Sequence, residues 1–237
     1  MLKYKDIITT PTKPLLPDIT VCTECEHDSA LPRIDRQYFL KELNNKWLEK
    51  TVHNTILGLF VAPGKVVYQY INYDREQIIK PIAYLLLMSV IFLWSLNQFD
   101  KNFDKSLEIA SDLKKNMHWI QFIQAIFMAW VMARWTYKDS GYNFYECAVL
   151  TTYLQAQIFL LTAILMSLSI FVGHIEWLLN FSIVPEFLYT FWGITQFFHA
   201  SNANDYKKAI FTLLANLGFF LILVVFIALL EIISKSF

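Results

Sequence analysis

The sequence predicts an all-α protein, a polytopic bundle of about five membrane-spanning helices that follows an N-terminal cytosolic region. Two observations support this fold class. Apolar residues make up 56% of the 237 residues and charged residues only 17%, whereas charged residues are about a quarter of an ordinary soluble domain. Beyond Lys80 the chain consists mainly of long apolar stretches, several of which approach or exceed the roughly 20 residues that a helix needs to cross the hydrocarbon core.

The chain divides into three expected parts. Residues 1–34 form a flexible head, because Pro11, Pro14, Pro17 and Pro32 interrupt regular structure. Residues 35–80 form an amphipathic helical region, and residues 81–237 form the membrane domain. The N-terminus has no long apolar core typical of a signal peptide. We therefore expect the head to stay in the cytosol.

The amphipathic region has apolar side chains at helical spacings of three and four, and lysines on its other faces. Two interpretations remain open. The helix lies in the membrane interface with its tryptophan at headgroup depth, or it packs on its own protein. The residues expected at the membrane surface are Lys41, Lys46, Trp47 and Lys50.

The expected spans cover residues 81–99, 117–135, 144–172, 177–199 and 209–233. Residues 174–184 form either a short surface helix or the start of the fourth span, and Pro185 would kink a span that began before it. Eleven of the twenty basic residues precede the first span, which predicts a cytosolic N-terminus in the cell inner membrane. An odd number of spans then places the C-terminus on the opposite side.

Several polar side chains fall inside these spans, where polar groups are costly. One interpretation is hydrogen bonding between helices, at about 0.6 kcal/mol and at most ~2 kcal/mol each. The other is that these side chains line a hydrated path through a monomer or an oligomer. The candidates are Gln121, Gln124, Glu146, Gln157 and Glu186.

The pair Cys22 and Cys25 is half of a structural zinc site, because zinc in such sites has four ligands. His27 is too close to Cys25 to complete the site comfortably. Zinc binding would therefore need ligands from elsewhere, such as a second subunit, and we expect no cofactor otherwise. The chain has only three cysteines, an odd number, which disfavours a disulfide framework.

Three stretches resemble a bacterial membrane-protein family known as domain of unknown function 3667. They are "TILGLFVAPGKVVYQYINYDREQIIKPIAYLL", "YNFYECAVLTTYLQAQIFLL" and "FLYTFWGITQFFHASNANDYKKAIFTLL". The resemblance covers residues 35–237 and implies architecture but little chemistry. Many members carry an N-terminal zinc ribbon with two cysteine pairs, so the lone pair here implies a degenerate ribbon. The family's histidine after the third-span glutamate is Cys147 in this chain.

Catalytic motifs are absent from the sequence. It has no His-Glu-x-x-His, no Gly-x-Ser-x-Gly and no phosphate-binding glycine loop, so we expect no enzyme, and no nucleic-acid module is present either. The leading hypothesis is a membrane scaffold or sensor that works with a cytosolic protein partner, as in a stress or phage-defence accessory. It would be embedded in the lipid bilayer as a homo-oligomer. The alternative is an oligomeric ion channel lined by the intramembrane glutamines and glutamates.

Overall fold

The computed structural model describes residues 52–102, 110–172 and 183–236, and every regular element within these ranges is a helix. The all-α prediction is therefore confirmed for this part of the chain. The head, the cysteines of the expected zinc site and the expected surface residues Lys41, Lys46, Trp47 and Lys50 lie outside the described residues. So do residues 173–182.

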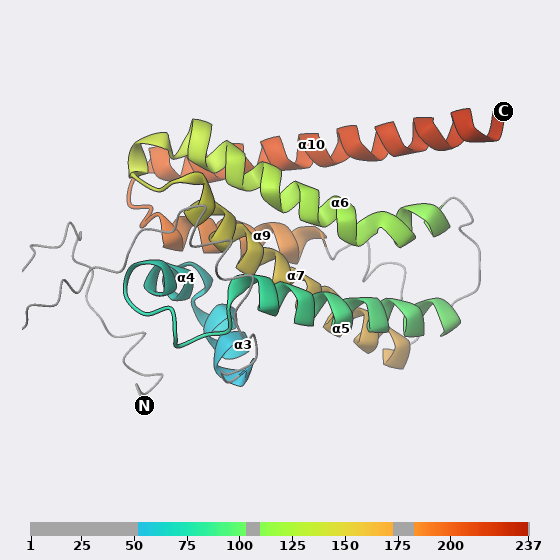
Figure 1. Cartoon of the computed structure of the whole chain (residues 1–237), viewed down its shortest axis with the longest axis horizontal. Helices are drawn as coiled ribbons and strands as arrows, with labels where there is room; N and C mark the ends of the chain where they lie inside the picture. The colour runs from blue at the N-terminus through green and yellow to red at the C-terminus, as the bar shows by residue number, and fades with distance from the viewer. Residues whose placement is uncertain (1–51, 103–109, 173–182, 237) are drawn as a thin grey trace, which may run out of the picture.

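The long helices that follow residue 80 alternate in direction along the long axis of the molecule (Figure 1). A short helical hairpin lies across one end of them and precedes them in sequence. The hairpin consists of α3 (Val52–Val61) and α4 (Pro63–Asn72). The long helices are α5 (Pro81–Asn102), α6 (Ala110–Val131), α7 (Phe144–Val172), α9 (Ile183–Phe197) and α10 (Ala203–Ser236).

Helix α7 is the centre of the bundle. Its apolar segment Phe144–Ser169 is 78% buried by protein, against 33% for Pro81–Gln98 of α5 and 11% for Ala203–Ile227 of α10. A helix that is apolar on all sides is buried on all sides, and the middle of α7 follows this rule, because every residue from 153 to 159, or about two full turns, is buried. Helices α3, α4, α5, α6 and α9 pack against it, whereas α10 packs against α6 and α9.

Three helices are long and apolar enough to cross a membrane, namely α5, α7 and α10. The outer faces of α5 and α10 expose large apolar side chains that include Val90, Trp94, Ile222 and Phe226. Such continuous apolar surface is unusual for a protein in water but suits a lipid environment. These features indicate a membrane protein.

The other two expected spans correspond to α6 and α9, which do not meet the same criterion of length and composition. Helix α9 has 15 residues, or about 22 Å at 1.5 Å per residue, which is shorter than a hydrocarbon core of about 30 Å. Pro185 is the third residue of the described helix, a position where its missing amide proton removes no intrahelical hydrogen bond. The count of five spans stays a prediction.

A compact connection joins α6 to α7. It consists of a π-helical turn η1 (Met132–Thr136) and a 3-10 turn η2 (Lys138–Ser140). Gly141 follows with a φ of 80°, a left-handed conformation that glycine adopts without strain. At the start of α7, the Asn143 side chain accepts a bond from the Glu146 amide at 2.9 Å, and the Glu146 carboxylate accepts one from the Asn143 amide at 2.8 Å. This reciprocal pair is a capping box.

Candidate functional site

The α3–α4 hairpin is a helix broken at one point. Pro63 occupies the first turn of α4, a position that tolerates the missing amide proton and its fixed φ. Immediately before it, α3 ends, and the Ala62 amide still donates to the Gly58 carbonyl at 2.9 Å. The two short helices also pack closely, because a Cβ on Gly58 would lie 3.3 Å from Val66. The break leaves two helix ends inside the protein, each with backbone groups that need partners.

Helix α9 supplies partners for both broken ends. The Tyr189 hydroxyl donates to the Leu59 carbonyl, in the last turn of α3, at 3.1 Å. The Gln196 side-chain oxygen accepts from the Gly64 amide, in the first turn of α4, at 3.2 Å. Because these side chains lie seven residues apart, or about two turns, they reach the hairpin from one face of α9.

Gly64 allows α4 and α9 to approach to backbone contact. A Cβ at this position would meet the Gly193 carbonyl oxygen, the Phe197 amide nitrogen and the Gln196 Cβ at 2.5 Å or less. Gly193 is close to α7 in turn, but there a Cβ would meet only the side chain of Leu154. A glycine is therefore required at residue 64 by close approach of two backbones, which no side-chain rotation can relieve.

The loop that follows α4 is held in the same way. Its Ile79 amide donates to the Thr55 hydroxyl of α3 at 3.0 Å, and the Ile79 carbonyl accepts from the Tyr153 hydroxyl of α7 at 2.6 Å. Ile78 and Ile79 are buried. We call the three side chains that hold the hairpin and its loop from the bundle, Tyr153, Tyr189 and Gln196, the clasp.

A group of buried tyrosines surrounds the centre of the clasp. The Tyr153 ring lies 5.5 Å from Tyr70 and 6.1 Å from Tyr84, measured between centroids. The Tyr84 hydroxyl donates to the Gln157 side-chain oxygen. Gln157 is completely buried, and its side-chain nitrogen has no hydrogen-bond partner among the described residues. Gln157 thus joins α7 to α5 by a hydrogen bond, as the interhelical interpretation expects.

We expect Tyr84→Phe to destabilise the protein by about 1–3 kcal/mol, because it leaves both polar atoms of the buried Gln157 side chain without a partner. The double variant Tyr84→Phe, Gln157→Leu removes both partners and should recover most of that loss. Unfolding free energies of the four proteins in one detergent, combined as a double-mutant cycle, measure the interaction. Strictly additive losses would contradict the assignment.

Aromatic side chains cover the outer end of the hairpin. The Tyr68 ring stands edge-on to His199 at 4.6 Å, and Tyr142 lies 4.8 Å from Phe197. Burial raises the pKa of Tyr142 to about 12, which a hydrogen bond with Asn72 opposes in part. Burial, followed by the charge of Lys65, lowers the pKa of His199. Both pKa shifts favour the neutral form of the side chain.

The polar side chains expected inside the spans take part in separate contacts and do not gather at one site among the described residues. Gln157 faces α5, whereas Glu186 of α9 bonds the Thr162 hydroxyl of α7 at 2.9 Å. Glu146 is buried in the capping box at the start of α7. Gln121 and Gln124 are half-buried on α6, and the buried Gln121 side-chain oxygen has no partner in the part of the chain that the structure describes. This oxygen and the unpartnered Gln157 nitrogen do not bond each other.

The hairpin and its clasp were missed by inspection of the sequence. The break at Pro63 and Gly64 is visible there, and Tyr153 and Gln196 are visible as polar residues in expected spans. Nothing in one sequence shows that Gly64 meets a residue 132 positions away. The described residues contain no group of three or more His, Cys, Asp or Glu side chains that could hold a metal ion, and Cys147 is a buried free thiol.

Comparisons with known proteins bear on this same segment. No curated protein and no solved structure matches the chain. A family model matches residues 49–93, which contain α3, α4, the loop after them and the first part of α5. The match therefore covers the hairpin itself, whereas the expected degenerate zinc ribbon lies outside it. Over residues 49–93, the chain resembles the family described as "Protein of unknown function (DUF3667)".

Proposed function

We propose that the protein is a non-enzymatic scaffold or sensor in the cell inner membrane, which works with a cytosolic protein partner through its N-terminal region. The observation that carries this proposal is the clasp. The N-terminal region continues directly into α3. Side chains of α9 hold the α3–α4 hairpin by its backbone, and Tyr153 of α7 holds the loop after it. A displacement of the hairpin must therefore be shared with the centre of the bundle.

The charge distribution supports a cytosolic position for the hairpin end of the bundle. At this end the Tyr137 ring, in the turn between α6 and α7, stacks on Phe198, after α9, at 3.7 Å. Phe198 also contacts Tyr142, and Tyr68 of α4 contacts His199. Basic residues are frequent on the cytosolic side of membrane proteins. Those near this end are Lys65, Arg75, Lys80, Arg134, Lys138, Lys207 and Lys208.

In this proposal the bundle responds to the state of the bilayer or to assembly with further copies, and the amphipathic region presents the response to its partner. Such a device suits a stress or phage-defence accessory, in which a membrane event must reach a cytosolic effector. The buried contacts of α7 support a structural role for this helix, because its polar side chains bond neighbouring segments. Tyr153 bonds the loop residue Ile79, Gln157 bonds Tyr84 of α5, and Thr162 bonds Glu186 of α9.

We expect charge reversal of the amphipathic region to abolish partner binding. The variant Lys41→Glu, Lys46→Glu, Lys50→Glu should lose at least tenfold of its partner in quantitative proximity labelling in cells. The bundle should stay intact by its melting temperature in detergent. The control variant Lys3→Glu, Lys5→Glu, Lys13→Glu changes the same number of charges in the head. Equal labelling of every cytosolic protein by both variants and the wild type would refute the proposal.

The second candidate is an oligomeric pore, and one observation favours it. The buried side-chain oxygen of Gln121 has no partner within the described chain, so water in a path or a second copy of the chain would satisfy it. A pore predicts ion flux in liposomes that the variant Gln121→Leu, Gln124→Leu abolishes. The scaffold predicts no flux in either protein.

A further inference from the structure

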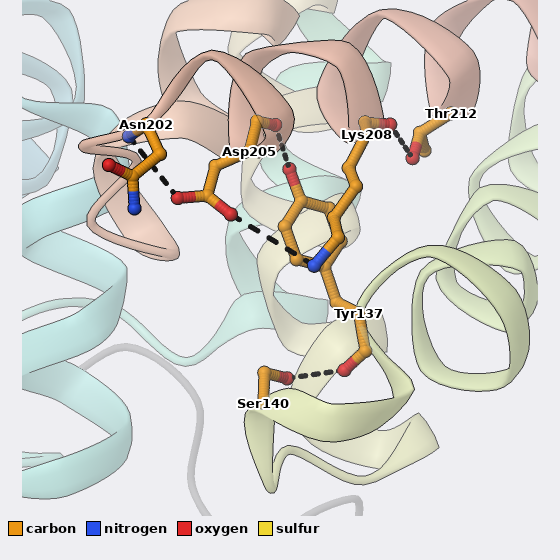
Figure 2. A network of polar contacts seen from close by, with 6 residues as sticks. All are labelled: Tyr137, Ser140, Asn202, Asp205, Lys208 and Thr212. Carbon is orange, nitrogen blue, oxygen red and sulfur yellow. Dashed lines mark hydrogen bonds and ion pairs between the residues drawn. The ribbon is translucent and has the colours of Figure 1, made fainter.

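The turn between α6 and α7 and the first turns of α10 form one fixed surface (Figure 2). The Tyr137 hydroxyl donates to the Asp205 carbonyl at 3.3 Å. The Thr212 and Thr136 hydroxyl oxygens lie 3.0 Å apart. Residues more than 60 positions apart in sequence are thereby held together, so their side chains form a preformed surface rather than two independent loops.

This surface carries an excess of exposed positive charge. Arg134, Lys138 and Lys207 are exposed, whereas Asp139 is the exposed acid next to them. The Lys208 charge is already paired within the protein, because its ammonium lies 3.9 Å from the Asp205 carboxylate and 5.9 Å from the centre of the Tyr137 ring. The Asp205 carboxylate pairs with the Lys208 ammonium and accepts a hydrogen bond from the Asn202 backbone amide (Figure 2).

Exposed aromatic side chains indicate where the basic side chains lie relative to the lipid headgroups. Trp135 is 55% exposed and Tyr206 is 41% exposed. Tyr206 lies at the start of the apolar segment Ala203–Ile227, and the apolar segment of α7 begins at Phe144. Tryptophan and tyrosine concentrate at the level of lipid headgroups. The exposed basic groups beside them therefore lie where lipid phosphates are found.

We propose that Arg134, Lys138 and Lys207, which we call the basic corner, bind the phosphate groups of anionic phospholipids. The proposal rests on the membrane placement proposed above, but not on the cytosolic partner. Arginine binds phosphate oxygens with two parallel hydrogen bonds, and lysine supplies point charge. Basic side chains at the membrane surface attract anionic lipid within a Debye length, by a factor of about five for each charge. The three lie at the same end of the bundle, on two elements that hydrogen bonds fix to each other.

The test uses the full chain in nanodiscs with equal amounts of phosphatidylglycerol and phosphatidylethanolamine. Native mass spectrometry counts the lipids that stay bound after release. We expect the wild type to retain phosphatidylglycerol preferentially, and the variant Arg134→Gln, Lys138→Gln, Lys207→Gln to lose at least tenfold of that preference. The control is Lys101→Gln, Lys114→Gln, Lys115→Gln, which removes as many charges at the opposite end of α5 and α6.

Each possible result distinguishes lipid binding by the basic corner from an alternative. Retention of both lipids in the supplied proportion by the wild type would overturn the proposal and favour an acidic protein as the ligand of the corner. An equal loss in both triple variants would overturn it in favour of bulk charge. If the corner variant does not insert, the salt dependence of the wild type is the test. Its preference for phosphatidylglycerol must fall as ionic strength rises, and a preference that is independent of salt refutes the proposal. Failure of the wild type to insert would contradict the proposed membrane placement itself. Failure to find a cytosolic protein partner would contradict the proposed function but not lipid binding by the basic corner.

Discussion

Replacement of Gly64 by alanine is expected to lower the free energy of unfolding by about 3 kcal/mol, at the upper end of the range for an overpacked site. The added Cβ would meet two backbone atoms of α9 at less than contact distance. Helices α4 and α9 would have to separate, and the bond from the Gly64 amide to Gln196 would lengthen. Thermal unfolding in detergent, followed by the fraction that remains monodisperse, measures the loss.

The other glycines supply a graded control series for this prediction. Gly218→Ala adds a Cβ with nothing within 4 Å, so its stability should match or slightly exceed that of the wild type. Gly193→Ala meets only the flexible end of Leu154 and should fall between the two. A ranking in which Gly64→Ala is no worse than Gly193→Ala would contradict the close approach of α4 and α9.

Removal of the α9 half of the clasp is the second change with a large expected effect. The variant Tyr189→Phe, Gln196→Leu leaves the Leu59 carbonyl and the Gly64 amide without their partners. An unsatisfied buried polar group costs on the order of 1–3 kcal/mol. Because both groups lie at the break of the hairpin, we expect the cost to appear as local opening of α3 and α4 rather than as loss of the whole bundle.

The positions of helices such as α5 and α7 could be predicted from the sequence, because local sequence features mark them. Pro81 begins α5, and apolar residues fill α7 over the residues where a span is expected. The contacts between helices have no such cues. Gln157 and Thr162 are five residues apart on α7, or about 140° around the helix. Gln157 therefore faces α5, while Thr162, the partner of Glu186, faces α9. A shared path cannot be judged from span positions alone, because rotation of each helix decides which side chains meet.

The hairpin shows the same limit more strongly. The short apolar run of α3 and the Pro-Gly break indicate a helix interruption, but not whether the segment lies on the membrane or inside the protein. Residues 52–72 pack on the protein, with Leu59, Val67 and Tyr70 buried. Only the partners on α7 and α9, more than 70 residues away, determine this outcome.

Hydrogen–deuterium exchange of the variant Tyr189→Phe, Gln196→Leu tests the central claim most directly, which is that α9 holds the hairpin by its backbone. We expect amides of residues 55–72 to exchange about 10- to 100-fold faster in Tyr189→Phe, Gln196→Leu than in the wild type, from a loss of about 1–3 kcal/mol. Amides of α10 should stay unchanged. The matched control Tyr206→Phe removes an exposed hydroxyl that also bonds a backbone carbonyl, that of Ala200, and should alter neither region. Unchanged exchange in residues 55–72 of the clasp variant would contradict the claim.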